Sequence, residues 1–71
     1  MSFTKLHHAV RQGDLQTCEE LLTQGEDVNA LDKHGNTPLM LALDTEAGHP
    51  LVAKKLVNSG AKVIYLFFLQ Y

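Results

Sequence analysis

Histidine and cysteine are the residue types in this sequence of 71 residues that most readily bind transition metals, and it has four histidines and one cysteine. His7 and His8 are adjacent, so on a helix their side chains point about 100° apart and do not converge on one ion. Cys18 falls among apolar residues at helical spacing, which indicates a small buried hydrophobic side chain. Because neither a Cys-x-x-Cys nor a His-x-x-x-His spacing occurs, we predict no metal site and no cofactor.

Acid–base catalysis needs a carboxylate or a histidine within reach of a reacting group. Asp32 is a candidate general base, but it stands three residues before Gly35, where a turn-forming role accounts for it. The sequence has no nucleophile elbow, no glycine-rich phosphate loop and no metalloprotease helix. We therefore expect a protein that is not an enzyme.

The charge pattern and the hydropathy argue against two further classes of protein. The formal net charge is −2, and acidic and basic residues are interspersed, so no basic stripe is available for nucleic acid. The longest apolar run, from Val63 to Leu69, is far shorter than the ~20 residues of a membrane-spanning helix. A single cysteine and a first segment unlike a secretory signal favour a reducing compartment. We expect a cytoplasmic or nuclear location, no nucleic-acid partner and no integral membrane insertion.

The residues from 32 to 43 contain a turn followed by the start of a helix. Gly35 can adopt a positive φ without steric cost, so it closes a tight turn after Asp32. Thr37 is an N-cap residue, because its hydroxyl can accept from a backbone N–H one turn further on. Pro38 then occupies the first helical position, where its missing N–H is not needed. These residues predict a helix over about 37–45.

One structural pattern occurs twice. Residues Thr4–Val10 align with Thr37–Leu43 at an offset of 33, and Leu21–Gly25 align with Leu56–Gly60 at an offset of 35. Two extra residues therefore enter the second copy between its helices, around residues 44–47. The first copy predicts helices over about 4–12 and, with Asp14 as the cap, up to about 24. The second copy predicts its helices over about 37–45 and from about 50 to 60.

The motif Gly-x-Thr-Pro-Leu-x-x-Ala from Gly35 to Ala42, with Asp32 before it, resembles the opening of an ankyrin repeat. Gly48-His49, Leu56-Val57 and Gly60–Val63 resemble the rest of that repeat. The resemblance covers about residues 3–63, as a first unit over about 3–31 and a second over about 32–63. It implies an all-α fold: a fragment of an ankyrin-repeat solenoid, with two stacked helix–loop–helix units and a hairpin-like loop between them. We assign residues 1–63 to this domain.

The same resemblance implies roles for two histidines. His7 occupies the position at which the family places a histidine that is hydrogen-bonded into the neighbouring turn, and His49 matches the family's Gly-His helix start. A further expectation follows from stacking the two copies. Glu19 and Glu20 align with Lys54 and Lys55, so the acidic pair should face the basic pair across neighbouring helices. At an exposed surface this is worth only ~0–1 kcal/mol per pair.

Members of the family bind other proteins through their hairpin tips and the inner face of the first helix of each unit. The resemblance therefore implies non-catalytic protein–protein interaction, with a partner whose identity the sequence does not give. Carried over by position, the partner-binding residues are Leu31, Lys33, His34, Asn36, Arg11, Gln12, Asp44 and Thr45. Leu31 is the expected anchor, because an apolar residue in a polar loop is typical of a binding hot spot. The alternative is that Leu31 packs against a neighbouring hairpin.

Two other functions stay open at this point. The first alternative is an inhibitor or regulator that occludes an enzyme's cleft. The second is a shortened fragment of a longer ankyrin array, without independent function. The apolar residues 64–71 depart from the repeat pattern and have three readings. They fold back as a cap over the second unit, they are the non-native ending of a fragment, or they dock on a partner, a membrane surface or another copy in self-association.

Overall fold

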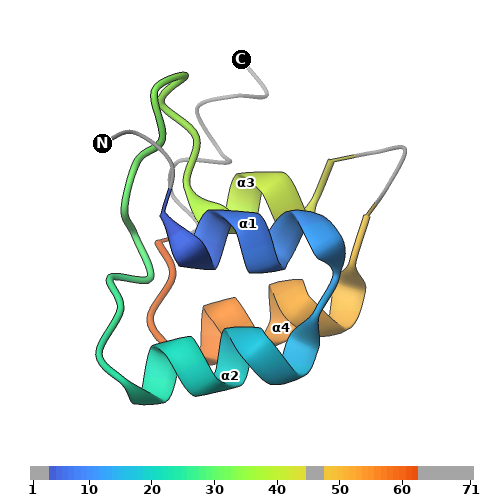
Figure 1. Cartoon of the computed structure of the whole chain (residues 1–71). Helices are drawn as coiled ribbons and strands as arrows, with labels where there is room; N and C mark the ends of the chain where they lie inside the picture. Colours follow the sequence, from blue (N-terminus) through green and yellow to red (C-terminus); the bar gives the residue numbers. More distant parts are fainter. Residues whose placement is uncertain (1–3, 45–47, 63–71) are drawn as a thin grey trace.

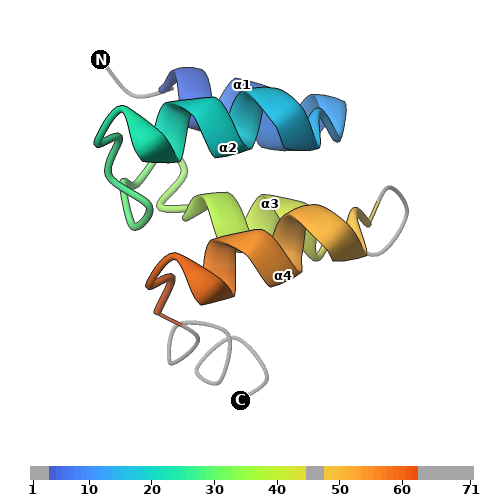
Figure 2. The same cartoon turned by 90° about the horizontal axis from the view of Figure 1, so that it is seen from below.

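The computed structural model describes residues 4–44 and 48–62, which form two pairs of helices. The first pair is α1 (Lys5–Gln12) and α2 (Leu15–Thr23), and the second is α3 (Pro38–Ala42) and α4 (Pro50–Asn58). In Figure 1, α1 lies beside α3 in one layer and α2 beside α4 in the other. Figure 2 shows the first pair stacked on the second. No strand occurs among the described residues, and the all-α prediction of two stacked helix–loop–helix units is confirmed.

The first helix of each unit begins in the same way. The hydroxyl of Thr4 accepts a hydrogen bond from the backbone N–H of His7 at 3.1 Å, and the hydroxyl of Thr37 accepts one from Met40 at 3.2 Å. Both threonines have extended backbone angles, with φ −81° and ψ 166° and 162°. Each side chain thus satisfies a donor that the first helical turn leaves without a partner. The predicted threonine cap of the second unit is confirmed, and the first unit repeats it.

The second helix of each unit also ends in the same way. The N–H of Glu26 donates to the carbonyl of Leu21 at 3.1 Å, and the N–H of Ala61 donates to Leu56 at 2.9 Å. In each case the preceding residue is a glycine, with a φ of 93° at Gly25 and 100° in the second unit. A side chain with a Cβ rarely adopts this left-handed conformation, which explains the glycines.

Helix α3 ends at Ala42, so the predicted end near residue 45 is wrong. The carbonyl of Ala42 accepts from the N–H of His49 at 2.8 Å. In the first unit, the carbonyl of Ala9 accepts from the N–H of Asp14 at 3.1 Å at the equivalent positions. The bond that joins the two helices of a unit is therefore kept, and the additional residues of the second unit lie outside α3. Residues 45–47 are outside the described part of the chain.

The hydrophobic core lies between the helix pairs. Leu6, Val10 and Leu56 are fully buried, and Cys18 is fully buried with them. Burial raises the pKa of the Cys18 thiol, so the side chain stays neutral. This confirms that Cys18 is a small hydrophobic core residue. The other buried apolar members of the core are Ala9, Leu21, Leu39, Ala42, Val52 and Ala53.

Two side chains of the first unit hold the second unit by hydrogen bonds. The Nε2 of the buried His7 donates to the carbonyl of Asn36 at 2.9 Å, while its Nδ1 lies 2.8 Å from the Thr4 hydroxyl. Because a carbonyl only accepts, the Nε2 atom of His7 carries a proton. The Nδ2 of Asn29 donates to the carbonyl of Gly60 at 3.2 Å, and its Oδ1 accepts from the N–H of Lys62 at 2.8 Å. The expected role of His7 is confirmed; the role of Asn29 was not anticipated.

An ion pair also crosses from the first unit to the second. The Nζ of Lys55 lies 3.8 Å from Oε2 of Glu19, and both side chains are well exposed. This confirms the expected facing of acidic and basic residues for one of the two pairs. Such a pair adds only ~0–1 kcal/mol in solvent.

Candidate functional site

The tip of the loop between the units is built around the carboxylate of Asp32. Its Oδ1 accepts from the backbone N–H groups of His34 at 2.8 Å and Asn36 at 2.9 Å. The backbone N–H of Asp32 donates to the carbonyl of Asn36 at 3.0 Å, and Gly35 donates to the carbonyl of Asp32 at 3.0 Å. The N–H of Asn36, followed by that of His34, holds the pKa of the Asp32 carboxyl below its usual value. The turn-forming role predicted for Asp32 is thus confirmed.

This turn presents three of the predicted partner-binding side chains to solvent. Leu31 is 55% exposed, and Lys33 and His34 are also exposed. Asn36 is half-buried, and its backbone bonds to Asp32 and His7 tie the turn to the helices. The turn can therefore make one apolar contact, through Leu31, beside the polar side chains of Lys33 and His34. Several hydrogen bonds hold its backbone in place.

Three more of the predicted residues gather at the opposite end of α1 and α3. Arg11, Gln12 and Asp44 line one pocket of about 330 Å³ together with Leu41 and His49. In Figure 1 the loop between α2 and α3 rises at one end of the α1–α3 layer, and the C-terminal ends of α1 and α3 lie at the other. The predicted footprint is therefore two clusters on one layer rather than one continuous patch. Thr45 lies outside the described residues.

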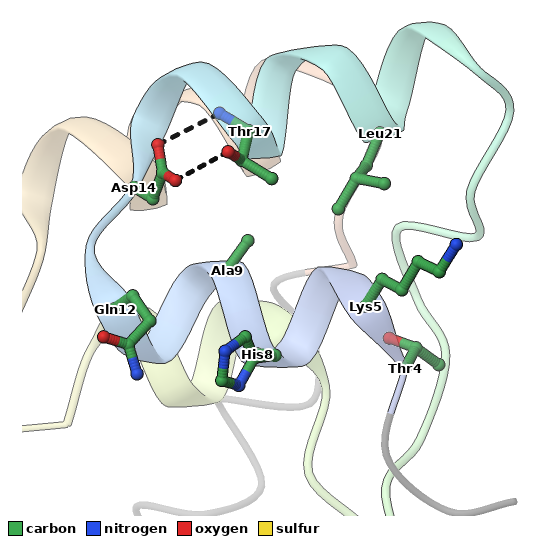
Figure 3. A pocket seen from close by; sticks show the side chains of 8 residues that line it. All are labelled: Thr4, Lys5, His8, Ala9, Gln12, Asp14, Thr17 and Leu21. Atoms are coloured by element: carbon green, nitrogen blue, oxygen red, sulfur yellow. Dashed lines mark hydrogen bonds between the residues drawn. The ribbon is translucent and has the colours of Figure 1, made fainter.

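A second groove runs between α1 and α2, on the face of the first unit that lies away from α3 and α4 (Figure 3). Its volume is about 530 Å³, and Ala9 and Leu21 form its apolar floor. At one end, Asp14 accepts from the N–H and the hydroxyl of Thr17 at 3.1 and 2.6 Å (Figure 3). These bonds, the hydroxyl's first, lower the pKa of the Asp14 carboxyl. The remaining lining residues are Thr4, Lys5, His8 and Gln12.

Sequence reasoning did not find this groove, but the internal alignment contains a signal for it. The second unit buries or half-buries apolar residues at three positions where the first unit has polar ones. The first unit has Lys5 for Pro38, His8 for Leu41 and Thr17 for Val52. The polar rim suits contact with water.

Among the described residues, no three potential metal-binding side chains come together. The histidines are divided among separate places: His7 lies in the core, His34 at the loop tip and His49 at the start of α4. No helix in residues 4–44 and 48–62 is long and apolar enough to cross a membrane.

Comparison with protein families agrees with this architecture. The family model of ankyrin repeats in three copies matches residues 2–65 of the chain. The chain belongs to the ankyrin-repeat family, and the described residues contain two of its helix pairs. The ankyrin repeat is a non-catalytic fold that generally mediates protein–protein interaction.

The chain is similar to short parts of longer proteins. It is 38% identical over 60 residues to an ankyrin repeat-containing protein of Saccharomyces cerevisiae, covering 84% of this chain and 11% of that protein. It is 43% identical over 56 residues to the ARF GTPase-activating protein Git of Drosophila melanogaster, covering 79% and 7%. It is 38% identical over 56 residues to human protein phosphatase 1 regulatory subunit 27, covering 79% and 35%. The matched regions are thus about a third or less of these proteins.

Proposed function

We propose that this chain binds another protein through the loop tip and the exposed side of the α1–α3 layer. The observation that carries the proposal is the exposed Leu31 next to a turn that the Asp32 carboxylate holds closed. Leu31 enters an apolar pocket of the partner, and Lys33 pairs with an acidic group beside that pocket. An exposed apolar side chain on a fixed backbone is a typical hot-spot anchor.

The rigidity of the turn supports this proposal. Binding by a loose loop must also offset the entropy lost when the loop becomes ordered. Here Asp32 fixes the turn from within, and His7 fixes it to α1 through the carbonyl of Asn36. The loop tip is therefore ordered by folding, before any partner arrives. The free energy gained from the Leu31 contact then contributes to the affinity and does not have to offset the ordering of the loop.

The size of the surface limits the affinity. A helix of eight residues is only ~12 Å long, so the two clusters span a small patch. A standard interface buries ~800 Å² per partner, which two units do not readily supply. We expect this chain alone to bind weakly, and more strongly as part of a longer array or an oligomer.

A regulatory function is the second candidate. One of the similar proteins is a phosphatase regulatory subunit, and the likeness covers 79% of this chain. In this function the loop tip occupies the rim of an enzyme's cleft and excludes its substrate. An activity assay of the partner with and without the chain separates this regulator from a passive adaptor.

The test is a pair of substitutions at the loop tip. A partner is captured from a lysate and identified, and its binding is titrated against the natural chain and against Leu31→Ala with Lys33→Ala. We expect the double variant to bind at least several-fold more weakly with an unchanged melting temperature. Leu51→Ala is the matched control, because Leu51 is 69% exposed on α4, away from the α1–α3 layer. Equal loss of binding in both variants, or a loss of stability with unchanged binding in the double variant, would refute the proposal.

A further inference from the structure

Equivalent positions of the two units are buried to different extents. Val10 of α1 is fully buried, whereas Leu43, its equivalent in the second unit, is 45% exposed. Leu22 of α2 is half-buried, whereas its equivalent Val57 is 44% exposed. In the first unit these positions are covered because α3 and α4 pack onto α1 and α2. No such pair of helices covers the second unit within residues 4–44 and 48–62.

Helical spacing places a third residue on the same side of the second unit. Met40 and Leu43 are three residues apart, so both lie on one side of the α3 segment, and Met40 is half-buried. We call Met40, Leu43 and Val57 the distal face. This apolar surface lies on the side of the second unit that corresponds to the side of the first unit covered by α3 and α4.

Another ankyrin unit fits the distal face poorly, because the polar bonds between the units cannot be repeated there. Where His7 donates to the next loop, the second unit has Met40, whose sulfur accepts from the N–H of Thr37 in its own unit at 3.4 Å. Where Asn29 bonds to the second unit twice, the equivalent residue is Ile64, which has no polar side chain. An occupant of this face must therefore be held by apolar contact.

The segment that follows the last described residue has this chemistry. Residues 64–71 contain two leucines, two phenylalanines, two tyrosines, one isoleucine and one glutamine, with no charge. Eight extended residues reach ~27 Å, about twice the ~13 Å length of a nine-residue helix such as α4. Neighbouring helices lie ~8–10 Å apart, so the segment is long enough to cross both α3 and α4. It begins two residues after Lys62, whose N–H is fixed by Asn29.

We propose that residues 64–71 dock on the distal face and cover Leu43 and Val57. The apolar side chains of the segment meet the exposed apolar side chains of the second unit, which removes both from water. Docking of the segment does not require hydrogen bonds equivalent to those that join the first unit to the second. The second unit is thereby closed by a short apolar segment.

Tyrosine fluorescence tests the docking of residues 64–71 directly, because the only tyrosines are Tyr65 and Tyr71 and the chain has no tryptophan. All of the emission therefore comes from the segment in question. We expect quenching by iodide to be several-fold weaker in the folded natural chain than in the same chain in denaturant. We also expect Leu43→Asp with Val57→Asp to raise quenching to the denatured value while circular dichroism stays helical. Leu51→Asp, at a leucine that is 69% exposed and lies away from the distal face, should leave quenching unchanged.

Two further measurements keep the test decisive. If the double variant does not fold, nuclear Overhauser contacts in the natural chain between the tyrosine rings and the Leu43 or Val57 methyl groups support the proposal, and their absence overturns it. Full quenching of the natural chain also overturns it. Protection that disappears on dilution, together with a dimer in sedimentation, shows instead that the segment docks on a second copy and contradicts the intramolecular contact.

Discussion

At the scale of single residues, His7 connects the fold to the loop that we propose binds a partner. Its ring is fully buried and hydrogen-bonded at both nitrogen atoms, to the Thr4 hydroxyl and to the carbonyl of Asn36. The bond to Asn36 joins residues 29 positions apart in the sequence and is a polar contact between the core of the first unit and the turn. The Asn36 carbonyl also accepts from the backbone N–H of Asp32, so the loss of His7 removes the bond that ties the turn to α1 and leaves the bond within the turn.

We therefore expect His7→Ala to lower the free energy of unfolding by about 1–3 kcal/mol, because both side-chain hydrogen bonds of a fully buried ring are lost and its space is left empty. His8→Ala, at the exposed neighbouring position, should change it by less than about 0.5 kcal/mol. Urea denaturation followed by circular dichroism measures both values. Similar losses in the two variants would show that the His7 bond does not stabilise the fold.

The carboxylate of Asp32 should make the stability depend on pH. Its pKa is lowered in the folded chain, so its contribution is fully present above the ordinary carboxyl pKa of about 3.9 and is lost as the pH falls through the lower folded value. Asp32→Asn should melt at a lower temperature than the natural chain at pH 7. The difference should shrink as the pH falls below about 3.9. Thermal melts of both proteins from pH 7 to pH 2 measure this, and a difference that does not change with pH contradicts it.

At the scale of the elements, the caps and the connections between helices decide where each helix ends. Gly13 ends α1 with a φ of 69°, and a Cβ at this position would lie 2.6 Å from the ring of His49. Gly25 also has a positive φ, but a Cβ there would meet nothing within 4 Å. A comparison of substitutions at these two glycines therefore separates the effect of backbone strain on stability from the effect of contact between the units.

Both Gly13→Ala and Gly25→Ala should lose about 1–2 kcal/mol of stability from the left-handed backbone. Gly13→Ala should lose more, because the ring of His49 must also move. Adding His49→Ala should remove the extra loss in a double-mutant cycle measured by urea denaturation. Equal losses for the two glycines would show that α1 and the start of α4 are not in contact at this point.

The loop between the units is also fixed at its first half, by Asn29. We expect Asn29→Ala to cost about 1–2 kcal/mol, since its side chain makes two hydrogen bonds to the end of the second unit. The backbone N–H of Lys62 should then exchange its hydrogen faster, because it loses its acceptor. Hydrogen exchange followed by NMR measures this. An unchanged rate at Lys62 would mean that the bond is not formed in solution.

At the scale of the whole molecule, the sequence predicts most of the fold because the unit occurs twice. The offset of 33 between Thr4 and Thr37 marks two matching helix starts, and the structure confirms that both threonines cap a helix. The turn at Asp32 is equally predictable, since it depends on residues within four positions. Local bonds of this kind follow from residue type and spacing alone.

What the sequence did not predict depends on distant partners. Asn29 bonds to residues 31 and 33 positions away, and a pattern of residue types does not contain such pairings. The early end of α3 follows from the bond between Ala42 and His49, which crosses the inserted residues. The division of the predicted partner-binding residues into two clusters also needs the three-dimensional arrangement. The involvement of these residues in binding stays a prediction.

The central claim is that two stacked units hold the loop tip in its binding shape before any partner is present. Hydrogen exchange of the His34 and Asn36 amides in the free chain tests it most directly, since both donate to the Asp32 carboxylate. We expect both amides to be strongly protected in the natural chain and to lose protection together in Asp32→Ala. Exchange at the rate of an unfolded chain in the natural protein would contradict a preformed binding loop.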